Sequence, residues 1–341
     1  MSKTALITGI SGQDGAYLSK FLLEKGYRVI GGDRRTARGS LWRLEELGIV
    51  DDIEITDCEL AEFTNIFRII EKYDLNEVYN LAAQSFVGVS FEVPTMTGDI
   101  TGLGVCRLLE AIRQVAPEIK FYQASTSELF GKAKEFPQSE ETQFHPRSPY
   151  AVAKLYGHWM TVNYRESYNI FATNGILFNH ESPLRGKEFV TRKITMSFAR
   201  IKNGLQDILE LGNLEPKRDW GFAGDFVEAM WLILQKDQPD DYVIATGENH
   251  SVKEFVEASA SCIGFDIIWE GKAEETVGID RKSGKTIVKV NPEFYRPAEV
   301  EQLIGDATKA QQQLGWSPNM SFEELVQLMV ESDLARVKKS F

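Results

Sequence analysis

Short apolar runs that alternate with helical stretches are the feature that most restricts how this chain can fold. Residues 4–9 (TALITG) are rich in β-branched side chains, and apolar residues recur at helical spacing from Asp14 to Lys25. Similar apolar runs, with helical patterns between them, lie at 27–31, 53–55, 77–81 and 120–124. Because parallel strands need a crossover between them, usually a helix, this alternation predicts a doubly wound α/β fold around a parallel sheet.

The alternation ends near residue 180. Basic and aromatic residues gather at 179–192 and 212–222, and a charged stretch at 270–289 breaks any simple strand–helix repeat. We therefore expect residues 1–180 to form a Rossmann-like domain and residues 181–341 to form a smaller, loop-rich region. No linker rich in Gly, Ser or Pro separates them, so the chain is expected to interleave between the two parts.

The composition excludes several classes of protein. Of the 341 residues, 43% are hydrophobic and 26% are charged, with a formal net charge of −12. This acidic balance argues against a nucleic-acid-binding surface, so an anionic ligand has to be held by local basic residues. No apolar run approaches the ~18 residues of a membrane span, and a cytoplasmic location is expected. Cys58, Cys106 and Cys262 do not have the spacing of a disulfide framework or a metal site.

Three glycines, Gly9, Gly12 and Gly15, give the spacing GxxGxxG at the junction of the first predicted strand and helix. Without side chains there, the backbone can approach a pyrophosphate closely, and the helix amides and positive dipole end face the anion. The position predicts a dinucleotide site. A glycine turn required only for packing is the alternative.

Asp33, Arg34 and Arg35, at the end of the second predicted strand, carry competing signals about the cofactor. An acid here would accept a hydrogen bond from a ribose 2′-hydroxyl, whereas an arginine would pair with a 2′-phosphate. Two arginines can neutralise the extra phosphate, so Arg34 and Arg35 favour NADP over NAD. A solvated run of charges is the alternative.

Tyr150 and Lys154 share one face of a predicted helix that begins after Ser148 and Pro149. A free tyrosine has a pKa of about 10, so Tyr150 acts as a base near neutral pH only where positive charge favours its phenolate. Lys154 supplies such a charge and can also donate to a cofactor ribose. A YxxxK pair alone is common by chance, and its place after a glycine turn and several strands makes it informative.

A polar cluster follows the apolar run 121–124. Its members are Ser125, Thr126, Ser127 and Glu128. Ligands of an open parallel sheet bind beyond the carboxyl ends of its strands, so three hydroxyls and a carboxylate at this position predict a catalytic cluster. Capping of a helix or turn by the hydroxyls, with Glu128 solvated, is the alternative.

Together these motifs resemble the extended short-chain dehydrogenase/reductase family, and the rest of the chain resembles its GDP-mannose 4,6-dehydratases. The similarity spans nearly the whole chain and rests on GISGQDG at 9–15, LAAQS at 81–85, STSE at 125–128, SPYAVAK at 148–154, NHESP at 179–183, KRDWG at 217–221 and FYRPAEV at 294–300. The last three segments are the specific ones, because many sugar-nucleotide epimerases and reductases share the glycine turn and the YxxxK pair.

The resemblance implies roles for individual residues. The catalytic residues would be Thr126, Glu128, Tyr150 and Lys154. Besides Arg34, Arg35, Tyr150 and Lys154, the NADP contacts would be Gly9, Gly12, Gln13, Asp14, Gly15, Glu59, Leu60, Leu81, Ala82, Ala83, Gln84, Ser85, His180 and Arg185. The GDP-sugar contacts would be Ser85, Asn179, Lys193, Arg218, Arg296 and Glu299. The basic members of this last set would give the diphosphate a local cationic pocket on an acidic protein.

The chain departs from the family's pattern in three places. Ser11 stands where threonine is common, Leu184 stands where an additional arginine often precedes Arg185, and residues 33–39 (DRRTARG) differ from the usual arginine-serine loop. In relatives this loop also reaches a neighbouring subunit. The resemblance implies a homo-oligomer, either a dimer or a tetramer, and the altered loop bears on both the cofactor and the assembly.

The reaction implied by the resemblance is an internal redox dehydration of GDP-mannose to GDP-4-keto-6-deoxymannose. Tyr150 would take the proton of the C4 hydroxyl while hydride passes from C4 to NADP. The ketone would acidify the C5 hydrogen, which Glu128 removes, and water would leave C6 with help from Glu128 or Thr126. Hydride would then return to C6, leaving the cofactor as it began.

Three other functions stay open at the level of sequence. A GDP-sugar 4-reductase or 4-epimerase needs Tyr150 and Lys154 but no carboxylate base such as Glu128. A 4,6-dehydratase of GDP-mannoheptose would act on a substrate that differs only beyond C6. A sensor that binds NADP without catalysis is the third, and the complete set of Thr126, Glu128, Tyr150 and Lys154 argues against it.

Overall fold

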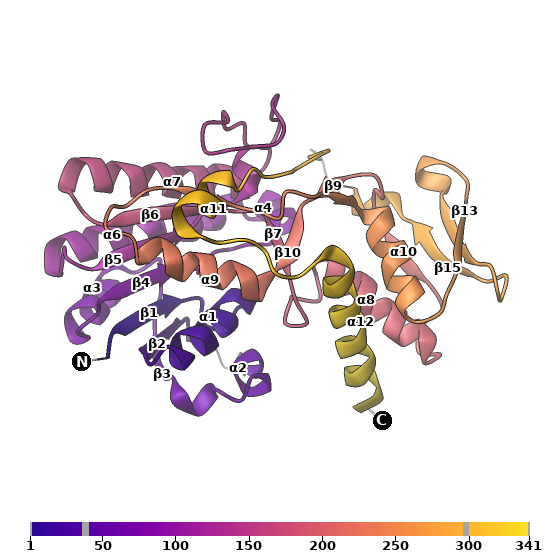
Figure 1. Ribbon diagram of the computed structural model, residues 1–341, viewed down its shortest axis with the longest axis horizontal. Helices are drawn as coiled ribbons and strands as arrows, with labels where there is room; N and C mark the ends of the chain where they lie inside the picture. Colours follow the sequence, from indigo (N-terminus) through magenta and orange to yellow (C-terminus); the bar gives the residue numbers. More distant parts are fainter. Residues whose placement is uncertain (1, 36–40, 296–299, 340–341) are drawn as a thin grey trace.

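A computed structural model describes residues 2–35, 41–295 and 300–339, and its large part is a seven-stranded sheet with helices on both faces (Figure 1). The strand order is β11-β6-β5-β4-β1-β2-β3, and every neighbouring pair is parallel. The strands are β1 (Thr4–Thr8), β2 (Arg28–Asp33), β3 (Glu54–Asp57), β4 (Glu77–Asn80), β5 (Lys120–Ala124), β6 (Ala172–Leu177) and β11 (Tyr242–Ile244). The predicted doubly wound fold is confirmed, and the predicted strands lie within a few residues of the observed ones.

The helices around this sheet divide between its two faces. They are α1 (Gln13–Glu24), α2 (Trp42–Glu46), α3 (Phe63–Lys72), α4 (Val87–Glu92), α5 (Pro94–Thr97), α6 (Gly104–Val115), α7 (Pro149–Tyr168), α9 (Ala223–Leu234) and α11 (Thr308–Leu314). Successive residues of β1 show the division: Ala5 and Ile7 pack with α1, α9 and α11, whereas Leu6 packs with α3, α6 and α7. This alternation is the two-residue period of a strand buried on both faces.

A smaller lobe lies to the right of the sheet in Figure 1. Its sheet has the order β13-β14-β15-β8. These strands are β13 (Ile267–Glu270), β14 (Val277–Asp280), β15 (Thr286–Val290) and β8 (Leu209–Leu211), and the lobe's helices are α8 (Val190–Lys202), α10 (Val252–Cys262) and α12 (Phe322–Lys339). Phe198, Phe255 and Met329, one from each helix, share a fully buried core.

The remaining elements of the described chain are short. They are β7 (Asn179–Glu181), β9 (Lys217–Arg218), β10 (Trp220–Phe222), β12 (His250–Ser251), η1 (Val50–Asp52), η2 (Gly98–Leu103), η3 (Ser127–Leu129), η4 (Ala273–Glu275) and η5 (Pro292–Phe294). From α8 onward the chain passes between the parts repeatedly, because α9, β11 and α11 lie with the large sheet while α10 and α12 lie with the lobe. A cut after residue 180 would therefore remove β11 from the large sheet.

A line of buried polar side chains holds the carboxyl ends of the central strands together. The Thr8 hydroxyl donates to Asn80 Oδ1 at 2.6 Å, and Asn80 Nδ2 donates to Gln123 Oε1 at 2.7 Å. Gln123 Nε2 in turn donates to the Ala124 carbonyl at 2.9 Å. Each of the three side chains is at most 1% exposed, so each pairing removes a desolvation penalty that an unpartnered amide or hydroxyl would carry.

The turn between β1 and α1 needs its glycines for space. Gly9 has a φ of +72°, and a Cβ there would lie 2.9 Å from the backbone of Ala82. A Cβ on Gly15 would lie 2.5 Å from the Gly9 carbonyl oxygen, so Gly15 is what allows α1 to begin this close to the strand. α1 begins after Gly12 without a side-chain cap, which leaves its first amides available to a ligand.

Among the described residues, no helix is both long and apolar enough to cross a membrane.

Candidate active site

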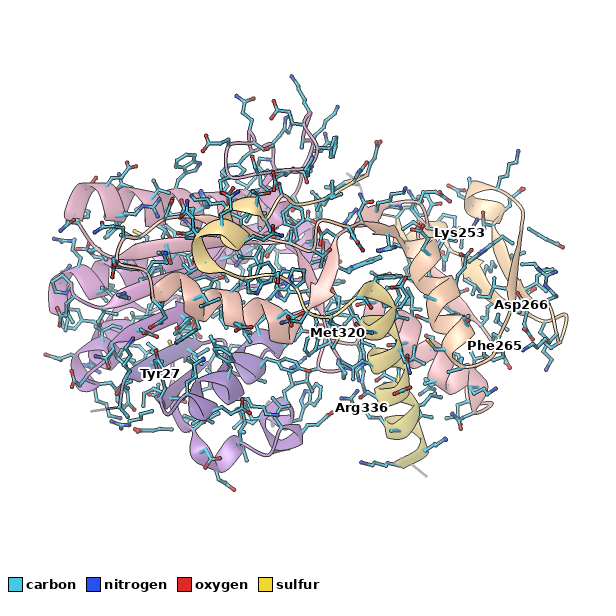
Figure 2. The ribbon with its side chains drawn as sticks, in the orientation of Figure 1. Tyr27, Lys253, Phe265, Asp266, Met320 and Arg336 are labelled. Carbon is cyan, nitrogen blue, oxygen red and sulfur yellow. The ribbon has the colours of Figure 1, made fainter. Side chains whose placement is uncertain are left out.

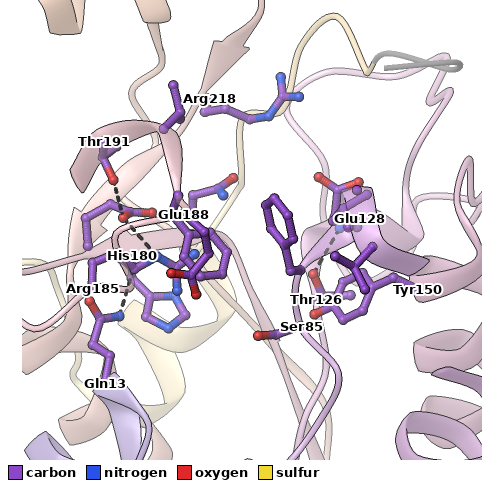
Figure 3. Close-up of a pocket in the computed structure, with 18 of the residues that line it drawn as sticks. Gln13, Ser85, Thr126, Glu128, Tyr150, His180, Arg185, Glu188, Thr191 and Arg218 are labelled. Atoms are coloured by element: carbon purple, nitrogen blue, oxygen red, sulfur yellow. Dashed lines mark hydrogen bonds and ion pairs between the residues drawn. The ribbon is translucent and has the colours of Figure 1, made fainter. Parts of the chain in front are cut away.

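A cavity of about 1060 Å³ lies between the carboxyl edge of the large sheet and the smaller lobe. Figure 3 shows its two sides: Thr126, Glu128 and Tyr150 stand on one, and His180, Arg185 and Thr191 face them from the other. The first side comes from the end of β5 and the start of α7. The second comes from β7, the segment that follows it and α8. Both parts of the fold therefore contribute to one cavity.

The cavity brings most of the predicted site residues together. Those that line it are Gly9, Gly12, Gln13, Asp14, Gly15, Leu81, Ala83, Ser85, Thr126, Glu128, Tyr150, Lys154, Asn179, His180, Arg185, Lys193 and Arg218. Arg34 and Arg35 are exposed beyond β2 and do not line it; neither do Glu59, Leu60, Ala82 and Gln84. Arg296 and Glu299 lie outside the described residues.

Tyr150 stands in the first turn of α7, where local sequence sets the geometry. The Ser148 hydroxyl accepts a hydrogen bond from the Ala151 amide at 3.1 Å, and Pro149 follows the cap, as predicted. Burial raises the pKa of Tyr150 to about 12, and the Glu128 carboxylate acts in the same direction, while a hydrogen bond with Thr126 opposes them. The phenol is therefore protonated near neutral pH.

Lys154 lies one turn further along α7. Its Nζ donates to the Ala124 carbonyl at 2.7 Å and lies 5.9 Å from the centre of the Tyr150 ring. Burial lowers the pKa of Lys154 to about 8, and the Asp14 carboxylate partly offsets this. Because the same carbonyl accepts from Gln123, the buried line of polar side chains ends at this ammonium group.

Thr126 and Glu128 belong to the turn that follows β5. The Thr126 hydroxyl accepts a hydrogen bond from the Glu128 amide at 3.3 Å, so Thr126 caps the short helix η3. Thr126 therefore has the capping role of the alternative interpretation and also lines the cavity. Glu128 is 9% exposed, so its carboxylate is largely shielded from solvent and is held beside Tyr150.

His180 lies between two hydrogen-bond acceptors. Its Nδ1 lies 2.7 Å from the Phe178 carbonyl oxygen, and its Nε2 lies 2.8 Å from Asp14 Oδ2. Despite burial, contact with His180 lowers the pKa of Asp14 to about 2, so both ring nitrogens face acceptors. Burial alone would lower the pKa of His180, but Asp14 reverses this and raises it. The ring also stacks on Phe226, with centroids 4.7 Å apart.

The opposite side offers further polar groups. Lys193 Nζ lies 3.9 Å from the centre of the Phe294 ring, and burial lowers the pKa of this lysine. Arg218 is 7% exposed and donates to the Lys217 carbonyl at 3.0 Å. Among the described residues, Asn179 Oδ1 is buried without a hydrogen-bond partner. An orphaned buried acceptor in a cavity wall fits a ligand that donates to it.

Comparison with known proteins gives the family. The family pattern described as GDP-mannose 4,6 dehydratase matches residues 6–329. The chain belongs to the GDP-mannose 4,6-dehydratase family. A relative of that name from Cricetulus griseus is 53% identical over 340 residues, covering 97% of this chain and 91% of the relative, and one from Yersinia enterocolitica is 49% identical, covering 99% and 95%.

A solved dTDP-glucose 4,6-dehydratase from Streptomyces venezuelae, with NAD bound, has the same fold at a TM-score of 0.83 and 19% identity, covering 99% of this chain and 98% of the other.

Several side chains that line or support the cavity were not predicted from the sequence. Lys187, Glu188 and Thr191 line the cavity, and the only sequence signal for them was the basic and aromatic cluster at 179–192. Arg43 is another: its Nε donates to the Leu184 carbonyl at 2.6 Å and its Nη1 to the Ser11 carbonyl at 2.8 Å. Contacts between residues far apart in the sequence leave no local pattern.

Proposed function

We propose that this protein converts GDP-mannose to GDP-4-keto-6-deoxymannose and holds NADP as a recycled hydride carrier. The observation that carries the proposal is the joint placement of Thr126, Glu128, Tyr150 and Lys154 in the wall of the cavity that also contains the glycine turn. A redox pair and a separate carboxylate base in one cavity match a reaction that needs both oxidation and elimination.

The residues present fit a nicotinamide dinucleotide. The uncapped first turn of α1 and the close approach allowed at Gly9 and Gly15 suit a pyrophosphate. Arg185 and His180, whose pKa is raised by Asp14, line the same cavity. When bound, the cofactor would take hydride from C4 of the sugar and return it to C6. The NAD bound by the Streptomyces venezuelae protein supports a cofactor of this class.

Arg34 and Arg35 favour NADP over NAD. Both side chains are exposed just beyond β2, and the Arg34 amide donates to Asp33 Oδ1 at 3.0 Å, so a carboxylate and two guanidinium groups stand at the same strand end. An exposed arginine can pair with a 2′-phosphate at small desolvation cost. The affinities of Arg35→Ala for NADP⁺ and NAD⁺ test this assignment, which requires the ratio between them to fall.

Tyr150 would take the proton of the C4 hydroxyl. Its pKa of about 12 means that the phenol must be made more acidic before it can act, and positive charge is the physical means. The Lys154 ammonium, 5.9 Å from the ring centre, supplies one such charge and can also hold a ribose hydroxyl. The Thr126 side chain, hydrogen-bonded to Tyr150, stabilises the phenolate.

Glu128 would remove the C5 proton after C4 has become a ketone. Oxidation of C4 acidifies this hydrogen. The Glu128 carboxylate lines the same cavity wall as Tyr150, which supports its assignment to the adjacent carbon. The proton acquired by Glu128 would then pass to the C6 hydroxyl as it leaves as water, with Thr126 assisting through a hydrogen bond. The proton that Tyr150 took from the C4 hydroxyl would pass to C5 and restore the hydrogen there. A net reductase or 4-epimerase would have no use for this carboxylate.

The GDP portion would bind on the opposite side of the cavity. Lys193 and Arg218 provide cationic partners for the diphosphate, and Asn179 Oδ1 can accept from a donor on the ligand. We assign Ser85, which also lines the cavity, to the sugar. Arg296 and Glu299 complete the proposed set on the basis of family resemblance.

We also propose that the protein acts in the cytoplasm as a dimer or a tetramer. Val152, Tyr156 and Trp159 on α7 are 55%, 42% and 53% exposed, an apolar surface suited to association between subunits. Light scattering coupled to size-exclusion chromatography will give the number of subunits, and a monomer would refute the assembly. Cell fractionation tests the location.

The function is tested by supplying purified protein with GDP-mannose, GDP-mannoheptose or neither, with no reductant added. The proposal requires that mass spectrometry detect the loss of one water from GDP-mannose. With GDP-mannose that carries deuterium at C4, it requires the deuterium to be found at C6 of the product. Stoichiometric consumption of NADPH, or deuterium at any other carbon, would contradict it. Preferential dehydration of GDP-mannoheptose would reassign the substrate while retaining the chemistry.

A further inference from the structure

A buried ion pair that does not line the cavity lies directly behind one wall of it. Arg192 and Asp333 are 1% and 0% exposed, and Arg192 Nε lies 2.8 and 2.7 Å from the two carboxylate oxygens of Asp333. Taking two charges out of water is expensive, and their mutual attraction often fails to offset it. A pair in such a position therefore requires an explanation beyond stability.

The Nη1 atom of Arg192 binds backbone carbonyl groups. Its Nη1 donates to the Pro183 carbonyl and, at 2.9 Å, to the Arg185 carbonyl. These two residues enclose a turn, here called the 183–185 turn, whose last side chain lines the cavity. The middle carbonyl, that of Leu184, accepts from Arg43. Three successive carbonyls are thus bound by two arginines from different helices.

On α8, Arg192 does not line the cavity, although both of its sequence neighbours do. Thr191 and Lys193 line the cavity, whereas Arg192 between them extends to α12 and the 183–185 turn. Thr191 also contributes to the placement of Arg185, because Thr191 donates to Glu181 Oε2 at 2.5 Å and the same oxygen lies 3.0 Å from Arg185 Nε. The Arg185 guanidinium group further packs 3.6 Å from the centre of the Phe189 ring.

The other end of the network is anchored by α12. Asp333 accepts from Thr195 at 2.7 Å and from Arg336 at 3.0 Å, and Arg336 also pairs with Glu46 on α2. Figure 2 labels Arg336 on the C-terminal part of this helix. The helix that ends the described chain is therefore tied through Asp333 and Arg192 to the turn that carries Arg185.

We propose that Arg192 is a positioning residue for cofactor binding: by joining Asp333 of α12 to the 183–185 turn, it holds Arg185 in place in the cavity wall. Arg192 itself does not line the cavity. The inference rests on the proposed function, in which Arg185 contacts NADP. It adds that the Arg185 contact depends on the Asp333 carboxylate, 148 positions further along the chain.

The test measures binding of NADP⁺ to the purified protein by calorimetry, using Arg192→Met, Arg185→Ala and the double variant. Each single substitution is expected to weaken binding about tenfold, and the double variant is expected to bind no more weakly than Arg185→Ala alone. Asp333 retains Thr195 and Arg336 as partners in Arg192→Met, which limits the risk of unfolding. Arg192→Lys keeps the charge but cannot reach the carboxylate and both carbonyls, so it should weaken binding similarly.

A matched control is available in Arg165→Met. Arg165 makes a bidentate pair with Asp241, with both distances 2.8 Å, and donates to the Ala172 carbonyl, yet neither residue of the pair lines the cavity. This variant should lose stability and keep its NADP⁺ affinity. Additive effects of Arg192→Met and Arg185→Ala, or unchanged binding in both Arg192 variants, would overturn the inference while leaving the proposed function intact. Failure of the unmodified protein to bind NADP⁺ would instead contradict both the inference and the proposed function.

Discussion

The two sides of the cavity are built in different ways. The proposed catalytic side, formed by Thr126, Glu128, Tyr150 and Lys154, comes from the end of β5 and the first turns of α7, where capping hydrogen bonds join residues two or three positions apart. The opposite side, formed by Asn179, Arg185, Lys193 and Arg218, depends on contacts such as Arg192 with Asp333, 141 positions apart. Local backbone geometry organises the first side, and long-range packing organises the second.

The different construction of the two sides suits them to different functions, proton transfer on one and ligand recognition on the other. Proton transfer requires a reacting atom to be held within hydrogen-bond reach, and a strand end followed by a capped helix provides such rigidity. Recognition of a long ligand requires groups spread across a wide surface, which separate elements can supply together. We therefore expect substitutions on the catalytic side to lower kcat and substitutions on the opposite side to raise KM.

The largest effect is expected for Glu128→Gln. The amide cannot remove the C5 proton, so kcat for dehydration should fall by a factor of roughly 10² to 10⁴. Binding of NADP⁺ should be unchanged, because the substitution preserves the size of the side chain. Turnover near that of the unmodified protein, measured by mass spectrometry of the product, would show that another group is the base.

Lys193→Met should have the next largest effect, on KM for GDP-mannose. Loss of one charge-assisted hydrogen bond to the diphosphate corresponds to about 1.5–3 kcal/mol, or roughly 10- to 100-fold in KM. Because the cation acts equally on bound substrate and transition state, kcat should stay close to its original value. Steady-state kinetics separate the two parameters, and a fall in kcat with an unchanged KM would break the proposed division between the two sides.

Gly15→Ala tests the close packing of the glycine turn. Its Cβ would lie 2.5 Å from the Gly9 carbonyl oxygen and 2.7 Å from Ile10 Cα, so the free energy of unfolding should fall by about 1–3 kcal/mol. Gly98→Ala is the matched control, since Gly98 has helical φ and ψ and a Cβ there would meet no atom within 4 Å. The control should gain about 0.4–1 kcal/mol. Chemical denaturation of both variants measures the difference, and equal stabilities would refute the steric argument.

The smallest effect is expected for Asp14→Asn, and it should depend on pH. The pKa of His180 is raised, so its contribution to stability is complete below its unfolded pKa of about 6.5 and is lost as pH rises through the folded value. The Asp14 pKa of about 2 means that its contribution is lost only in strong acid. Thermal unfolding should show a larger loss of stability at about pH 6 than at about pH 9. An equal loss at both would mean that His180 is neutral.

Sequence patterns alone predicted the doubly wound fold and five strands of its large sheet, β1 to β5. The glycine spacing, the apolar runs and the Ser148–Pro149 start of α7 act over a few residues, and backbone preferences of that range survive in any context that allows them. The catalytic candidates Thr126, Glu128, Tyr150 and Lys154 could be found because each lies next to such a local signal. Their meeting in one cavity follows from the rule that ligands bind at the carboxyl edge of a parallel sheet.

The tertiary structure decided what surrounds them. The raised pKa of His180 depends on Asp14, 166 positions away, and the polar line through Thr8, Asn80 and Gln123 crosses three strands. The hold of Arg192 on the 183–185 turn depends on a helix near the end of the chain. Burial and charge pairing act through space, so only the folded chain determines which distant side chains share a proton, a carboxylate or a cavity wall.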